Sequence, residues 1–250
     1  MSAGEVLAIA LAGLSAGAIN TLVGSGTLIT FPVLLAFGYA PVTANVSNTI
    51  GLVPGSVSGA VGYRRELAGQ RSRALRLGAM SILGGLTGAI LLLLLPSAAF
   101  KAIVPVFIAL ALVLTVLQSR ISVWLIEREI DLDHSRSIFT PLAVFLTGVY
   151  GGYFGAAQGI MLLAILGVAL AQDLHRTNAL KNVLAGLTNG VAALYFVFAA
   201  HVDWGPAAII AAGSILGAQL GARYGRTLPP SALRAVIVTV GIFAIVRLLV

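Results

Sequence analysis

The stretch Asn20–Ile29, NTLVGSGTLI, interrupts an apolar sequence long enough to cross a membrane. It contains two glycines and several side chains with hydrogen-bonding groups, and apolar residues flank it on both sides. Glycine weakens a helix, and free backbone polar groups are not tolerated where they face lipid. Such a break survives at membrane depth only where it is buried in protein or lines a wet cavity. We therefore interpret the break as a functional feature.

The composition indicates a protein whose main solvent is lipid. Of 250 residues, 59% are hydrophobic and 9% are charged, and the mean hydropathy is +1.03. A soluble domain carries roughly 25% charged residues. The net charge of +7 does not indicate nucleic-acid binding, because 13 of the 15 cationic residues are arginines placed mainly between apolar runs, as topology determinants are. The chain has no cysteine, which excludes disulfides, Cys-based zinc sites and thiol catalysis.

The chain repeats itself at an offset of 133 residues, without a gap. SILGG at 81–85 aligns with SILGA at 214–218, Asn45 aligns with Asn178, and Gly26 aligns with Gly159. We interpret this as an internal duplication, the usual construction of secondary transporters. The first repeat would span 1–118, a charged linker 119–137, and the second repeat 138–250, together forming one transport domain.

Each repeat contains five apolar segments that we expect to be helices. The second segment of each is only about 12 residues long and would cover roughly 18 Å, too little for a hydrocarbon core of about 30 Å. We therefore expect the first two segments of each repeat to form a re-entrant hairpin with its tip inside the membrane. The segments span about 5–22, 27–38, 42–62, 75–95 and 98–118 in the first repeat, and about 138–154, 159–171, 178–199, 207–225 and 231–249 in the second.

The loop charges predict that the two repeats face opposite ways. Loop 64–76 holds five arginines, whereas its repeat equivalent 200–206 holds none. By the positive-inside rule the repeats are then inverted, and both termini lie outside the cytoplasm. Parallel repeats are the alternative, against which the loop charges argue. The predicted fold is an all-α polytopic membrane protein with two inverted-topology repeats, each a broken, re-entrant hairpin plus three transmembrane helices. The loops predicted to be cytoplasmic are 64–76, 119–137, 172–177 and 223–230.

The two breaks predict a site for an anion near the membrane midplane. A helix starting at Thr27, and another starting near Ile160, would direct free N–H groups and positive dipole ends at a shared cavity. The third segments add amides, and Lys181 adds the one fixed positive charge. No Asp or Glu lies deep in an apolar run, which disfavours a cation. The candidate binding residues are Asn20, Thr21, Gly24, Ser25, Gly26, Thr27, Asn45, Asn48, Thr49, Gln158, Gly159, Asn178, Lys181 and Asn182.

Structural interpretations of the same residues stay open at this point. The glycines of the break could form a simple kink, and Asn45 and Asn178 could bond neighbouring helices together. Lys181 could extend its ammonium group to the cytoplasmic surface. Gly84/Gly88 and Gly217/Gly221 have the small-xxx-small spacing of closely packed helices.

Enzyme motifs are missing from the sequence. There is no HExxH, GxSxG or Walker A motif, and no paired carboxylates lie in the apolar segments. We expect neither enzymatic activity, nor a metal, nor a cofactor.

Three stretches resemble the TauE/SafE family of sulfite and organosulfur-anion exporters. They are AGAINTLVGSGTLITFPVLL, PVTANVSNTIGLVPGSVSGAVGYRREL and LKNVLAGLTNGVAALYF. The resemblance covers nearly the whole chain and implies a multi-pass carrier of the bacterial or archaeal cytoplasmic membrane that moves sulfite, sulfonates or related anions. The second break, FGAAQG, departs from the pattern because it is poorer in glycine than the first.

Together these observations predict export of a small sulfur-containing oxyanion by alternating access. Export is favoured because moving one negative charge out at 100 mV, inside negative, gains roughly 2.3 kcal/mol. A proton-coupled importer, for which Asp173 is the nearby acid, an anion channel and a non-transporting scaffold are the alternatives. The expected partners are the anion and the lipid bilayer, with no nucleic acid; a homodimer is left open.

Overall fold

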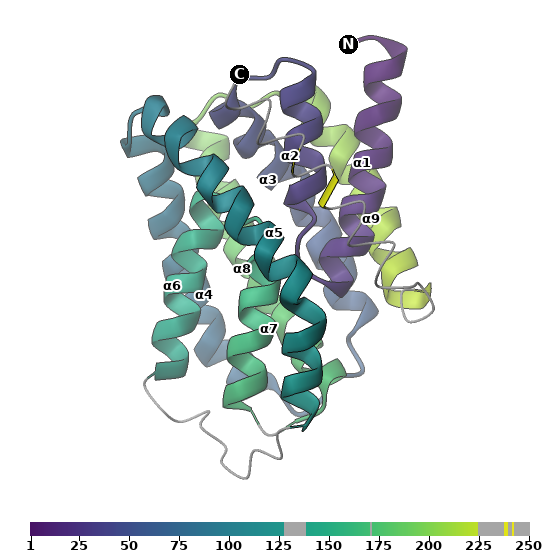
Figure 1. The fold of residues 1–250 in the computed structure, drawn as a ribbon, viewed down its shortest axis with the longest axis vertical. Coiled ribbons are helices and arrows are strands. Elements are labelled where there is room, and N and C mark those ends of the chain that lie inside the picture. Colours follow the sequence, from purple (N-terminus) through teal and green to yellow (C-terminus); the bar gives the residue numbers. More distant parts are fainter. Residues whose placement is uncertain (128–138, 171, 225–237, 240–241, 243–250) are drawn as a thin grey trace.

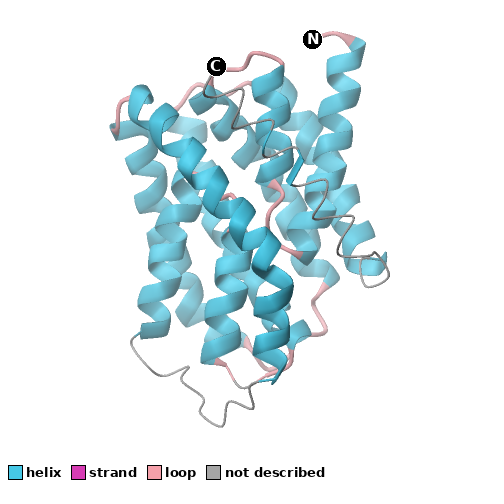
Figure 2. Ribbon diagram, viewed as in Figure 1, coloured by secondary structure: helices cyan, strands magenta, loops and turns pink. Residues whose placement is uncertain are grey.

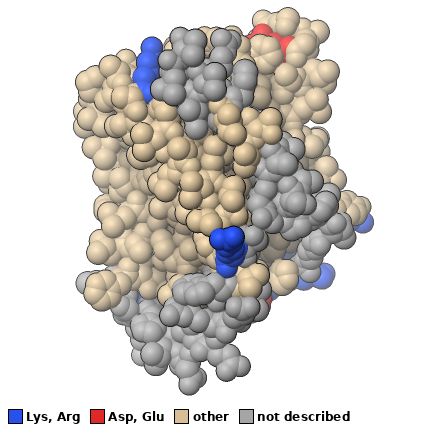
Figure 3. Space-filling model, viewed as in Figure 1, with Lys and Arg blue, Asp and Glu red and all other residues tan. Residues whose placement is uncertain are grey.

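Every secondary-structure element that the structure describes is a helix (Figure 2). This computed structural model describes residues 1–127, 139–170, 172–224, 238–239 and 242. Five of its helices are long and apolar enough to cross a membrane. Charged side chains gather toward the upper and lower parts of the visible face, with an uncharged band between them (Figure 3). The predicted all-helical, polytopic membrane architecture is confirmed at this level.

The helices follow the predicted segments closely. The largest difference is at α5, which continues to Glu127, past the predicted end at 118. Helix α4 begins four residues before the predicted 75, at Arg71, and α9 begins three before the predicted 207, at Trp204. Helix α8 begins four residues before the predicted 178, at Leu174, because Asp173 caps it by accepting from the N–H groups of His175 and Arg176. The linker beyond Glu127, loop 225–230 and most of the predicted helix 231–249 lie outside the described residues. The helices are α1 (Ala3–Leu22), α2 (Thr27–Ala36), α3 (Pro41–Gly62), α4 (Arg71–Leu94), α5 (Ser97–Glu127), α6 (Phe139–Tyr153), α7 (Gln158–Ala169), α8 (Leu174–Ala199) and α9 (Trp204–Tyr224) (Figure 1).

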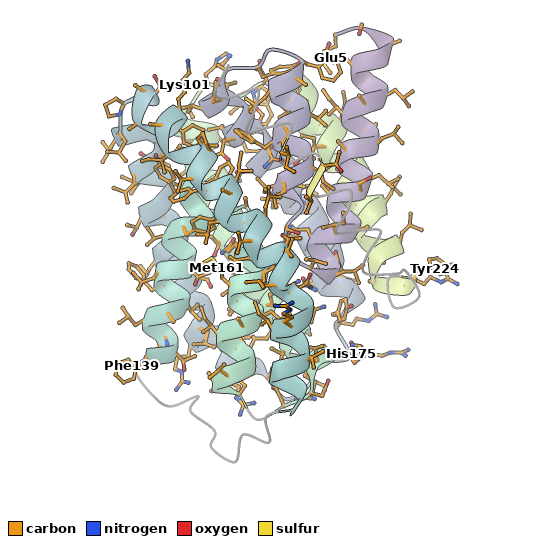
Figure 4. All side chains as sticks on the ribbon, viewed as in Figure 1. Glu5, Lys101, Phe139, Met161, His175 and Tyr224 are labelled. Atoms are coloured by element: carbon orange, nitrogen blue, oxygen red, sulfur yellow. The ribbon has the colours of Figure 1, made fainter. Side chains whose placement is uncertain are left out.

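Helices α1 and α2 form a hairpin that returns to its starting end. Glu5, near the start of α1, accepts a hydrogen bond of 2.6 Å from the Tyr39 hydroxyl, which follows α2. Figure 4 places Glu5 and Lys101 at the end of the molecule that we call the upper end.

Helices α6 and α7 form the second hairpin, which starts from the opposite end. Phe139, at the start of α6, and His175, just after α7, both lie at the lower end, while Met161 in α7 lies between the two ends (Figure 4). Both broken helices therefore have their tips inside the molecule, one entered from each end.

Glycines allow the first helix of each hairpin to pack against a helix of the other half. A Cβ atom at Gly88 of α4 would collide with the backbone of Val149 on α6, and one at Gly217 of α9 would collide with the backbone of Leu14 on α1. The predicted close helix packing is confirmed at four glycines: Gly84, Gly88, Gly217 and Gly221.

Candidate functional site

The two helix breaks meet in the interior. The Gly159 N–H donates a hydrogen bond of 3.1 Å to the Gly24 carbonyl, and a Cβ atom on either glycine would collide with the backbone of the other. Two segments from different halves thus touch through bare backbone, which only glycine permits. Thr27 begins α2 as predicted, and Gln158 begins α7 two residues before the predicted start near Ile160.

Both breaks contain left-handed backbone, but they are not identical. Gly24 has a φ of 86° in the first break, whereas the second has Gly155 at 76° and Ala157 at 59°. Ala157 aligns with Gly24 at the 133-residue offset and is the one non-glycine residue with positive φ in the described part of the chain. Left-handed backbone costs an L-residue about 1–2 kcal/mol. The second break therefore holds a left-handed residue at the position of Gly24 without a glycine there, and adds another at Gly155.

Two repeat-equivalent asparagines bind the ends of the broken helices. Asn45 on α3 donates from Nδ2 to the Tyr153 carbonyl at the end of α6, at 3.0 Å. Asn178 on α8 donates from Nδ2 to the Thr21 carbonyl near the end of α1, at 3.2 Å. Each asparagine thus reaches from one half to the hairpin of the other. The Oδ1 atoms of both are buried and have no hydrogen-bond partner.

Lys181 is fully buried, with an exposed fraction of 0%. Its Nζ donates to the carbonyls of Asn20 and Thr21, at 3.1 and 3.3 Å. These carbonyls lie in the last turn of α1, where the helix dipole is negative. Among the described residues no carboxylate pairs with this ammonium. The interpretation that Lys181 extends to the surface is wrong.

Further buried polar groups flank the meeting point of the breaks without partners. Ser25 Oγ and Gln158 Nε2, which align at the 133-residue offset, form no hydrogen bond, and neither does the Tyr153 hydroxyl. An unpaired buried polar group costs about 1–3 kcal/mol, so each one requires an explanation such as water or a ligand. A cavity of about 10 Å³, room for about one water molecule, is lined by Asn20, Thr21, Ser56, Asn182 and Ala185, and so by none of these three groups.

The other predicted residues hold the frame around this point. Asn48 exchanges side-chain hydrogen bonds with Thr27 and Thr30 and so joins α3 to α2. Thr49 donates to the Asn45 carbonyl of its own helix, at 2.9 Å. Asn182 adds a third donor to the Thr21 carbonyl, at 3.2 Å.

Gly26 of the first break allows α2 to lie close to α1. A Cβ atom there would lie 2.5 Å from the Ala16 carbonyl oxygen. The contacts of Gly26, Asn48 and Thr49 therefore hold the helices together. None of these three residues carries one of the buried polar groups that lack a partner.

Tyr153 is the residue that the sequence analysis missed. Its carbonyl accepts from Asn45, and its buried hydroxyl has no partner. The 133-residue offset makes Tyr153 the equivalent of Asn20, so applying the repeat to every candidate would have found it. In the described part of the chain, no group of three or more His, Asp or Glu side chains is arranged to hold a metal ion.

Comparisons with known proteins agree over nearly the whole chain. The family model described as sulfite exporter TauE/SafE matches residues 9–248. A "probable membrane transporter protein ORF9" of Sinorhizobium is 30% identical over 94% of this chain and 88% of its own. The "probable membrane transporter protein YfcA" of Escherichia coli K12 is 25% identical over 94% and 86%, and a probable membrane transporter protein of Haemophilus influenzae is 27% identical over 90% and 87%. No solved structure matches the chain.

Proposed function

Because the chain belongs to the TauE/SafE sulfite exporter family, we propose that it exports a small sulfur-containing oxyanion, either sulfite or an organosulfonate. The cytoplasmic membrane of a bacterium or archaeon is the proposed location. The buried ammonium of Lys181 carries the proposal, because it lies where the two broken helices meet and has no carboxylate partner among the described residues.

An anion would relieve an electrostatic cost at this lysine. Burying an ammonium ion costs several kcal/mol even after relaxation, unless an opposite charge lies beside it. An ammonium has three N–H donors, and the structure records bonds from Lys181 to two carbonyls. One donor remains for an oxyanion oxygen, and its hydrogen bond would be charge-assisted on both sides.

The unpartnered groups favour an oxyanion that carries a proton or a bound water. The Ser25 and Tyr153 hydroxyls and the Gln158 amide can donate to oxyanion oxygens. The Oδ1 atoms of Asn45 and Asn178 can only accept, so they match an O–H group better than a bare dianion. A singly protonated sulfite supplies both kinds of partner.

Two inverted repeats rocking about the Gly24–Gly159 contact would expose this site to each side in turn. The two hairpins entered from opposite ends, the left-handed backbone at both Gly24 and Ala157, and the reciprocal bonds of Asn45 and Asn178 support this arrangement. The arginine-rich loop between α3 and α4 lies at the lower end, because its Ala68 carbonyl accepts a hydrogen bond from Arg176, the neighbour of His175. By the positive-inside rule such a loop faces the cytoplasm, so the lower end is the proposed cytoplasmic end.

A proton-coupled importer has less support from the acid considered for it. The Asp173 carboxylate is exposed and caps α8 through the His175 and Arg176 N–H groups, so it holds a helix end rather than facing the buried site.

Anion binding to the purified protein is the first test of this proposal. We expect sulfite or an organosulfonate to raise the midpoint of thermal unfolding by mass action, while choline does not. In a panel of sulfite, sulfate, thiosulfate, sulfoacetate, taurine and phosphate, no stabilisation by any anion would refute an anion carrier and favour a scaffold. Currents that grow in proportion to anion concentration without saturating would indicate a channel instead.

A further inference from the structure

A second cavity lies at the upper end, apart from the buried site. Its volume is about 430 Å³, and it is lined by the 38–42 segment between α2 and α3 together with Leu35, Ser97 and Lys101. This space is large enough for a small oxyanion with part of its water shell. None of the candidate residues of the buried site lines it.

The lining of this cavity carries one positive charge, and two carboxylates lie beyond its wall, because Glu5 and Asp203 both act on Tyr39. Lys101 is the one ionised side chain in its lining, and its ammonium-bearing side chain is exposed. Ser97 contributes a hydroxyl and stands at the first position of α5, where the helix dipole is positive. Lys101 and Ser97 are therefore the groups free to face an anion, since the Tyr39 hydroxyl donates to Glu5.

The Tyr39–Glu5 bond fixes the wall of the cavity. Burial, followed by this hydrogen bond, raises the pKa of Tyr39 to about 12. The phenol therefore stays protonated at physiological pH and keeps the loop after α2 tied to the start of α1.

An aromatic layer separates the cavity from the buried site. Phe100, next to Lys101 in the chain, contacts the ring of Phe154 at 6.1 Å and that of Tyr153 at 5.7 Å between centroids. Phe31, one turn before Leu35 on α2, contacts Phe100 at 6.4 Å and Phe154 at 5.2 Å. The layer ends at Tyr153, whose carbonyl binds Asn45 of the buried site. Residue contacts thus lead without interruption from the cavity to the buried amides.

We propose that the upper cavity is the release site of the transported oxyanion, with Lys101 and Ser97 binding the ion after it has passed the Phe31–Phe100–Phe154 layer. This inference rests on the proposed export function. The cavity then holds a second anion site, on the external side. This site binds the ion more weakly than the buried site does and leaves more of its water shell in place.

The absence of cysteine from the chain makes a direct test available. An Ala40→Cys variant carries one thiol at an exposed residue that lines the cavity but has no proposed part in binding, and its modification by a membrane-impermeant maleimide in intact cells can be timed. Sulfoacetate is the probe, because sulfite itself reacts with maleimides. We expect sulfoacetate to slow labelling several-fold, choline to have no effect, and Gly4→Cys, an open position near the start of α1, to be labelled without protection.

Matched variants isolate the charge of Lys101. Protection should persist when Lys101→Arg is added to Ala40→Cys and disappear when Lys101→Gln is added. The cysteine-free protein is then tested in proteoliposomes. There, Lys101→Gln should raise the external sulfite concentration that inhibits sulfite efflux by half about fivefold or more. The internal sulfite concentration for half-maximal efflux should not change.

The outcomes separate this inference from the proposed function. If the purified protein binds sulfoacetate but Ala40→Cys is labelled at the same rate with and without it, the release site is refuted and the buried site stands. Labelling that needs permeabilised cells would also refute it, because the cavity would then open inward. If the protein neither binds nor transports any anion of the panel, the proposed function falls, and the release site falls with it.

Discussion

At the scale of single residues, Lys181 has two separable roles. Its ammonium holds the last carbonyls of α1, and in the proposed function it also receives the anion. Asn178 and Asn182 donate to the same Thr21 carbonyl, so this helix end does not depend on the lysine alone. A side chain of similar length without charge can therefore separate the anion-binding role from the structural one.

Lys181→Met should weaken anion binding strongly while leaving the protein folded. Replacing a buried charge by an apolar side chain of similar volume is often neutral or stabilising, so the unfolding midpoint without anion should change by only a few degrees. Loss of a charge-assisted hydrogen bond should weaken anion affinity about 10- to 100-fold. Thermal unfolding with and without sulfite measures both effects, and an unchanged sulfite-induced shift would contradict the role of Lys181.

Gly24→Ala should disrupt the contact between the breaks, and Gly69→Ala is its matched control. Both glycines have positive φ, of 86° and 78°, but a Cβ atom at Gly24 collides with Gly159, whereas at Gly69 its nearest neighbour is a side-chain nitrogen of Arg176 at 3.8 Å. Each alanine costs about 1–2 kcal/mol in backbone conformation. Gly24→Ala should cost about 1–3 kcal/mol more from overpacking and should stop transport. Equal losses of thermal stability in the two variants would show that the contact is unimportant.

At the scale of elements, the sequence predicted the helices well where residues next to a helix end determine that end. The start of α2 at Thr27 follows from the glycines before it, and the pairing of α1 with α2 follows from the shortness of α2. The extension of α5 to Glu127 was missed because residues 119–137 were assigned together to a charged linker. The apolar sequence in fact continues past Arg120, through Ile121 and Val123 to Ile126, before the charges become dense.

The site was predicted only in part, for a physical reason. Asparagines and the lysine carry a visible side-chain signal, so Asn45, Asn178 and Lys181 were found. Their partners are main-chain carbonyls at helix ends, which every residue possesses and no sequence pattern marks. The aromatic layer was missed because its rings come from three segments far apart in the chain.

The close packing of α9 on α1 gives a prediction at the same scale. Gly217→Ala should lower the unfolding midpoint substantially, because a Cβ atom there would collide with the backbone of α1 at Leu14. Gly190→Ala on α8 is the control, since no atom lies within 4 Å of its Cβ position, and it should be neutral or stabilising by up to about 1 kcal/mol. Similar destabilisation by both substitutions would mean that α9 and α1 are not in contact at Gly217.

At the scale of the whole molecule, the proposal makes transport electrogenic. One negative charge leaving a cell at 100 mV, inside negative, gains about 2.3 kcal/mol, enough for an outward gradient of about 50-fold without a coupled ion. In proteoliposomes, reversing an imposed potassium diffusion potential should reverse the net movement of the anion. A pH gradient at zero voltage should drive none of it, and movement that follows pH instead would favour the proton-coupled importer.

The central claim is that the charge of Lys181, buried where the two broken helices meet, binds the transported anion. Equilibrium binding of radiolabelled sulfite to the purified protein tests it most directly, with Lys181→Arg and Lys181→Met as paired variants. We predict saturable binding to the unsubstituted protein, somewhat weaker binding to Lys181→Arg, and binding weaker by about 10- to 100-fold to Lys181→Met. Equal affinity in all three proteins would contradict the account.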